Sequence, residues 1–156
     1  MHRLQRLFDA LRDDRGAVAI ETALIAPVLV VMAIGGFQAS MIVTRQAELQ
    51  SAAAEGAAIA LANMPDTATK RTTLKSVLEV STSAQSRGVT VSVDPYYRCG
   101  STTALVTSDT ACGTDKVSRY VRIRLVQTYT PIWRKYGMGS SLRYGVTRYV
   151  MYSQSS

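Results

Sequence analysis

The chain has 156 residues, a net charge of +7 and 47% hydrophobic residues, so it has room for one modest domain besides a long apolar segment. Its only histidine is His2, which lies at the extreme N-terminus. Catalytic sets that need an imidazole in the folded part of the chain are therefore excluded, and a metal site built from Cys and His is not expected. We expect a protein that is not an enzyme and that binds no metal or cofactor.

Residues 1–16 read as a short basic leader. They contain four arginines and three aspartates, whereas the first basic residue after the apolar segment is Arg45. Lys and Arg near a membrane span favour the cytoplasmic side. The N-terminus is therefore expected in the cytoplasm and the rest of the chain on the periplasmic side.

The apolar segment that follows is long enough to cross a bilayer. Between Ala17 and Val43 the only ionisable side chain is Glu21, and a membrane-spanning helix needs about 20 residues. An ordinary signal peptide fits less well, because its apolar region has only about 7 to 15 residues. The sequence predicts a single-pass helix in the inner membrane, and a carboxylate inside such a helix usually has a function.

The junction of leader and helix reads Arg15-Gly16-Ala17-Val18-Ala19-Ile20-Glu21. It resembles the processing site of prepilins, in which a peptidase cuts after the Gly and Glu is the fifth residue of the mature chain. The continuation from Glu21 to Leu29 resembles the TadE-like minor pilins, or pseudopilins, of tight-adherence (Tad) pilus systems. Major Tad pilins usually carry Tyr directly after the Glu, so Thr22 favours a minor pilin.

This resemblance implies roles for three residues. Cleavage would separate Gly16 from Ala17 and create an ammonium at Ala17. Glu21 would pair with the N-terminus of an adjacent subunit and set the axial register. The implied partners are other pilins or pseudopilins, a prepilin peptidase and the inner-membrane pilus platform. The implied function is pilus assembly and surface adhesion, with possible incorporation into an extracellular pilus.

The helix is expected to continue through residues 45–63, which are rich in Ala, Leu, Gln and Glu. An unbroken helix over residues 17–63 would extend about 70 Å. Pro65 and its neighbours should end it. Residues 67–86 have apolar side chains at helical spacing and predict a second, shorter helix.

Beyond Gly88 the apolar period changes to two, which predicts three strands over residues 88–94, 117–130 and 142–152. Strands joined by loops suggest an antiparallel sheet whose apolar face packs on the helices. The fold class is therefore α+β: a long N-terminal transmembrane helix, a second short helix and a small antiparallel head. The expected division is residues 1–16 as leader, 17–63 as transmembrane and spine helix, and 64–156 as head.

The expected loop over residues 95–116 contains Cys99 and Cys112. Thiols on the exported side of the membrane can oxidise, so a disulfide is expected, with two unpaired thiols as the alternative. From Lys116 to Ser156 there are eight Lys or Arg and no Asp or Glu, which suits an acidic partner. No nucleic-acid-binding motif is present, so nucleic acid is not an expected partner.

Two other functions remain open at this point. The chain could be a single-pass membrane-anchored periplasmic binding module whose basic head captures an acidic ligand. It could also be a pseudopilin of a type II secretion system. Cleavage at Gly16 separates the first of these from a pilin, because a simple anchor has no need to lose its leader.

Overall fold

In a computed structural model of the chain, residues 14–137 and 139–154 are described, and the chain divides after Met41 into two compact units. Helix α2 comprises Asp14–Asn63, so its first part belongs to one unit and its last part to the other. The residues before Asp14, which include most of the expected leader, lie outside the described residues. The predicted end of the long helix at Asn63 is correct.

The last part of α2, from Ile42 to Asn63, belongs to the second unit, which we call the head from here on. Its buried side chains recur every three or four residues, which places them on one face of a helix. This buried face is made of small residues and one leucine: Leu49, Ala52, Ala53, Gly56 and Ala60. Small side chains let other elements come close to the helix backbone.

Helix α3 (Ala68–Ser81) follows a short break after α2. Thr67 is its N-cap and accepts a hydrogen bond from the backbone N–H of Lys70 at 3.3 Å. Leu74 and Leu78, one turn apart, are buried against the rest of the head. The apolar side chains at helical spacing thus correctly predicted a second helix in this part of the chain.

The prediction of one helix over residues 67–86 places the end of this helix five residues too late. The helix stops at Ser81, and a separate turn, α4 (Ala84–Arg87), follows. Thr82 donates its hydroxyl proton to the carbonyl oxygen of Leu78 at 2.6 Å, and Ser83 has φ 50° in the left-handed region. Such local side-chain bonds compete with helix propagation.

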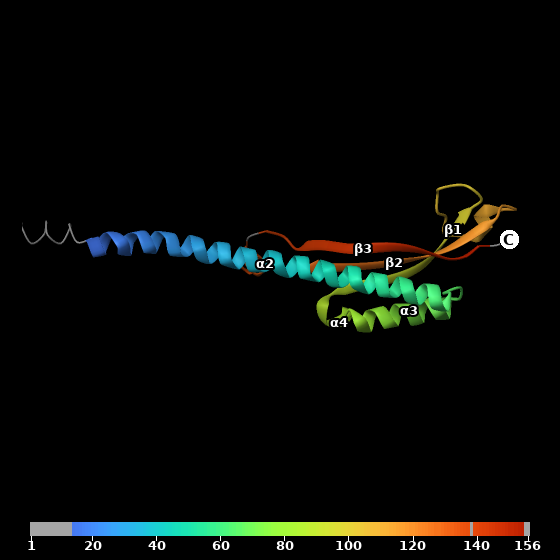
Figure 1. The fold of residues 1–156 in the computed structure, drawn as a ribbon, viewed down its shortest axis with the longest axis horizontal. Helices are drawn as coiled ribbons and strands as arrows, with labels where there is room; N and C mark the ends of the chain where they lie inside the picture. The colour runs from blue at the N-terminus through green and yellow to red at the C-terminus, as the bar shows by residue number, and fades with distance from the viewer. Residues whose placement is uncertain (1–13, 138, 155–156) are drawn as a thin grey trace, which may run out of the picture. The chain divides into compact units, whose positions relative to one another are not determined.

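The sheet has three antiparallel strands in the order β1-β2-β3 (Figure 1): β1 (Val89–Cys99), β2 (Val117–Tyr129) and β3 (Leu142–Gln154). Two 3-10 turns, η1 (Asp109–Cys112) and η2 (Ile132–Tyr136), lie in the connections. The predicted α+β class, with a long N-terminal helix, a short second helix and an antiparallel sheet, is confirmed.

Strand β1 is longer than predicted. The period-two pattern ended at Asp94, but the strand continues through Pro95 to Cys99, which shortens the expected loop to residues 100–116. Pro95 has no N–H to donate, and it is tolerated because β1 is an edge strand. The strand therefore extends five residues beyond its predicted end at Asp94.

One face of the sheet carries the core. Val91, Leu125 and Val146 stand in one row across the three strands, and the central strand adds the fully buried Val121 and Ile123. These side chains pack with α3 and with the last part of α2 in a single hydrophobic cluster. Burial of each large aliphatic side chain contributes about 1.5 to 3 kcal/mol.

A polar network joins the ends of these elements. Arg45 and Arg87 both donate to Glu48, at 2.8 and 2.7 Å, and so link α2 to α4. Gln127 of β2 donates to the carbonyl oxygen of Arg87 and accepts from the Tyr144 hydroxyl of β3, both at 3.1 Å. The buried amide of Gln127 is thereby satisfied on both sides.

Candidate functional site

The residues of the expected cleavage site lie in the first turn of α2. Gly16 and Ala17 have helical backbone, and Glu21 follows Ala17 by four residues. Residues four apart lie on the same face of a helix, one turn from each other. An ammonium created at Ala17 would therefore share a face with the Glu21 carboxylate, which is exposed.

Large apolar side chains are exposed along the first part of α2. Each has about half or more of its surface accessible within the single chain: Val18, Ile20, Leu24, Ile25, Val28, Leu29, Val30, Val31, Met32, Ile34 and Phe37. Pro27 lies inside this stretch without ending the helix. A helix that is apolar on all sides is suited to a membrane or to burial among other helices.

The polar groups of this stretch are few. The Thr22 hydroxyl donates to the carbonyl oxygen of Val18 at 2.8 Å, so it is satisfied by its own helix. Among the described residues, one helix is long and apolar enough to span a membrane, with a mean hydropathy of 2.3 over its most apolar window. Together with the exposed apolar surface, this helix indicates a membrane-anchored protein.

Comparison with protein families gives a match in this same region. Residues 16–58 match the family model described as TadE-like protein. The N-terminal part of the chain is TadE-like. The matched residues begin at Gly16 and end within the buried face of α2, so they cover the apolar helix and its entry into the head. Neither the comparison with curated proteins nor that with solved structures found a match.

The TadE-like match suggests a protein associated with a Tad pilus system. It confirms the resemblance drawn from residues 16–29 and extends it along the alanine-rich part of α2. The match does not reach α3 or the sheet of the head. The function of the head therefore has to be argued from its own surface.

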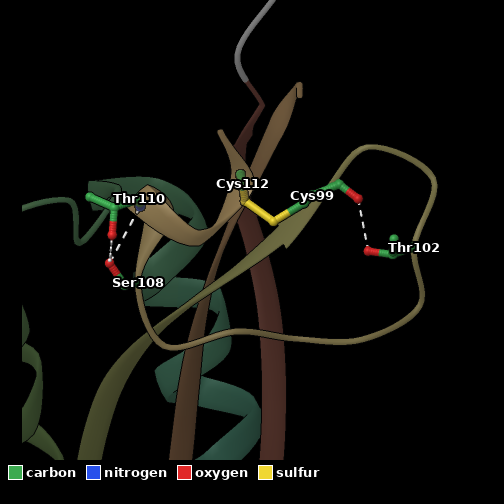
Figure 2. The surroundings of a disulfide bond; sticks show 5 residues. All are labelled: Cys99, Thr102, Ser108, Thr110 and Cys112. Carbon is green, nitrogen blue, oxygen red and sulfur yellow. Dashed lines mark hydrogen bonds between the residues drawn. A yellow bond between two sulfur atoms is a disulfide. The ribbon is translucent and has the colours of Figure 1, made fainter. Parts of the chain in front are cut away.

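The head contains the expected disulfide. Cys99, the last residue of β1, is bonded to Cys112 of η1, with their Cα atoms 5.0 Å apart (Figure 2). Thr102 donates its hydroxyl proton to the carbonyl oxygen of Cys99 at 2.8 Å, and Tyr97 and Val106 form an isolated antiparallel bridge. The loop after β1 is thus held to this strand by the disulfide, by the Thr102 hydrogen bond and by the bridge between Tyr97 and Val106.

The second face of the sheet carries arginines and hydroxyl groups instead of a core. Strand alternation and register assign fifteen exposed or half-buried residues to this face. We call it the Arg–Tyr face: Thr90, Ser92, Asp94, Tyr96, Arg98, Tyr120, Arg122, Arg124, Val126, Thr128, Arg143, Gly145, Thr147, Tyr149 and Met151.

Side chains from all three strands meet at the middle of the Arg–Tyr face. Arg122 donates to Asp94 at 2.7 Å, and its guanidinium lies over the Tyr96 ring at 4.7 Å from the centroid. The rings of Tyr96 and Tyr149 are in edge-to-face contact at 5.7 Å. Hydrogen bonding to Asp94 raises the pKa of Arg122 above its usual range. This arginine is therefore held in one position.

The period-two pattern predicted the three strands but not which of their polar side chains meet on this face. Alternation along a single strand tells which residues share a side, whereas neighbours on other strands depend on register. The pairing of Asp94 with Arg122 and of Arg122 with Tyr149 is a result of that register.

Proposed function

We propose that this chain is a minor pilin, or pseudopilin, of a Tad-type system that takes part in pilus assembly and surface adhesion. The observation that carries the proposal is the TadE-like match, which starts at Gly16, the residue after which cleavage is expected. The role is structural, because a pilin acts by packing its helix with other subunits and by presenting its head.

Processing after Gly16 would leave Ala17 as the mature N-terminus. The charged N-terminus would then enter an apolar environment, where an unpaired ammonium is costly. Glu21, on the same helix face and one turn away, is the first carboxylate of the chain that would remain after cleavage. In this proposal it pairs with the N-terminus of an adjacent subunit and fixes the axial register of assembly.

The proposed topology places the N-terminus in the cytoplasm and the head in the periplasm. The arginine-rich leader supports this orientation, since Lys and Arg favour the cytoplasmic side. The Cys99–Cys112 disulfide supports an oxidising location for the head. The proposed partners are other pilins, the inner-membrane platform and a prepilin peptidase.

The test is the N-terminus of the protein isolated from membranes of cells with and without the prepilin peptidase. Intact mass and N-terminal sequencing should show Ala17 as the first residue only when the peptidase is present. Gly16→Ala should block this change, whereas Gly36→Ala, a matched change within the same helix, should leave it intact. Retention of Met1 in both cells would favour the membrane-anchored binding module instead.

The role of Glu21 is tested by Glu21→Gln, which keeps the size of the side chain but removes its charge. Processing at Gly16 should proceed, whereas the variant should be depleted from assembled pili compared with its level in the membrane. Normal incorporation of the variant would contradict the proposed register pairing.

Lasting co-purification with type II secretion components would favour that system over a Tad pilus.

A further inference from the structure

The Arg–Tyr face has an excess of positive charge. It carries four arginines and one carboxylate, Asp94, which is paired with Arg122. Among the described residues, neither Arg124 nor Arg143 has an ion-pair partner. Both side chains are exposed, so two guanidinium groups of this face are available to an anionic ligand.

These two arginines border one hollow. The hollow has a volume of about 350 Å³ and is lined by Arg124, Val126, Arg143, Tyr144, Gly145 and Thr147. A Cβ atom at Gly145 would collide with the backbone carbonyl oxygen of Leu125, so no side chain can stand at this position without moving β3. The lack of a side chain keeps the middle of the hollow open between the two arginines.

The Asp94–Arg122 pair shows how a carboxylate sits on this face. Its 2.7 Å contact is a charge-assisted hydrogen bond, and the guanidinium is held on the Tyr96 ring behind it. A second guanidinium, that of Arg98, lies over Tyr120 at 5.4 Å from the ring centroid. From the row of Arg98 to that of Arg143, the face runs about 33 Å along β2.

The remaining groups of the face are mainly hydroxyls. Thr90, Ser92, Thr128 and Thr147 surround the arginines, and three tyrosines add phenolic hydroxyls. The face has few apolar side chains that could enter a bilayer; Val126 and Met151 are the exceptions. Such a surface complements a hydrated, linear molecule that carries both hydroxyl and anionic groups along its length.

We propose that the Arg–Tyr face binds an acidic polysaccharide, with carboxylates of its uronic-acid units on Arg124 and Arg143 and its sugar hydroxyls on Thr147 and the neighbouring hydroxyl groups. The carboxylate is the anion that this face already accepts at Arg122. A guanidinium fork suits a carboxylate because it can donate two parallel hydrogen bonds. The inference does not depend on cleavage at Gly16 or on incorporation into a pilus.

The test is the binding of the full chain, in detergent micelles, to polygalacturonate by biolayer interferometry. Methyl-esterified polygalacturonate is the matched ligand, because it keeps the sugars and loses the carboxylate charges. Arg124→Gln with Arg143→Gln should weaken binding about tenfold, corresponding to about 1.4 kcal/mol. Arg119→Gln with Arg148→Gln removes the same charge from the opposite side of the sheet and should change affinity less than about twofold.

Three results would overturn the proposal. The first is equal affinity for the esterified and the acidic polymer, which would exclude carboxylate recognition. The second is an equal loss in the Arg124/Arg143 and Arg119/Arg148 variants, which would indicate non-specific attraction. The third is tighter binding to a single-stranded oligonucleotide or to anionic vesicles than to polygalacturonate.

A variant with Arg124→Lys and Arg143→Lys should bind more tightly than the glutamine variant and more weakly than the natural chain, because lysine restores the charge without the two parallel donors of a guanidinium.

Discussion

The two parts of helix α2 differ in which side chains meet solvent within a single chain. Before Met41 the helix exposes valines, leucines, isoleucines, methionine and phenylalanine on all sides. After Ile42 it buries one narrow face of alanine, glycine and leucine against the sheet and α3. The last part of this helix thus buries its apolar face against its own chain. The first part leaves its apolar surface exposed.

The difference shows that the size of the side chains decides whether each part of α2 can pack against its own chain. Small residues let α3 and β2 approach the helix, so the head has its own core. Large, exposed side chains on every side cannot be covered by a chain whose head is already complete. They need lipid or the helices of other subunits. This requirement agrees with a TadE-like segment that starts in a membrane and is proposed to enter a pilus.

The largest expected effect on stability comes from removing a core side chain of the head. Leu78→Ala should lower the free energy of unfolding by about 2 to 5 kcal/mol, because Leu78 is fully buried between α2 and the sheet. Leu24→Ala, in the exposed part of α2, is the matched control and should leave the head's stability unchanged. Urea unfolding in detergent, followed by Trp133 fluorescence, measures both. If both substitutions lowered the free energy of unfolding equally, the first part of α2 would also contribute to the core of the head, which would contradict the division of α2 into an exposed and a buried part.

The disulfide should come next. Replacing both Cys99 and Cys112 by Ser should cost the head about 3 kcal/mol, because the unfolded chain gains the entropy of an open loop. The urea midpoint of unfolding is measured for the natural chain and for the double variant, each with and without a reductant. The reductant should lower the midpoint of the natural chain and leave that of the double variant unchanged. If the midpoint of the natural chain does not move, the disulfide contributes nothing to stability.

A smaller effect distinguishes two glycines of the same helix. A Cβ at Gly56 would meet Leu78 Cδ2 at 2.9 Å and Ile123 Cδ1 at 3.4 Å, whereas one at Gly36 meets nothing within 4 Å. Overpacking costs about 1 to 3 kcal/mol, and alanine returns about 1 kcal/mol of helix propensity.

Gly56→Ala should therefore destabilise the head by about 1 kcal/mol, and Gly36→Ala should not destabilise it. The urea midpoint of the full chain in detergent measures both variants. A stabilising Gly56→Ala would show that Leu78 can move aside at little cost, which would weaken the account of close helix packing.

The smallest expected effect is at high pH. Burial raises the pKa of Tyr152 above its usual value, and the neighbouring Tyr97 adds to the shift. The stability that this tyrosine contributes is fully present below about pH 10, the pKa of the unfolded chain, and is lost as the pH rises through the folded pKa.

Tyr152→Phe should therefore lose less stability than the natural chain as the pH rises above about 10, since phenylalanine cannot ionise. Urea midpoints measured across this range would show the difference as a shallower decline. An identical decline in both proteins would exclude Tyr152 as a source of alkaline instability.

Some elements followed from local sequence alone. The apolar run with one carboxylate, the junction at Gly16 and the alanine-rich continuation specify a long helix that ends before Pro65. Period-two alternation located the sheet, because side chains on a strand alternate between two faces. These signals lie within short stretches, where no distant contact is needed to interpret them.

Other features depend on the tertiary structure. The edge position of β1 lets this strand continue through Pro95, although the sequence alone predicted that it ends at Asp94. The hollow between Arg124 and Arg143 depends on the register of β2 with β3 and on the close approach of Gly145. The sequence by itself determined the membrane helix and its TadE-like character. Only the packed sheet decided which charges stand together, because register joins residues that are far apart in the chain.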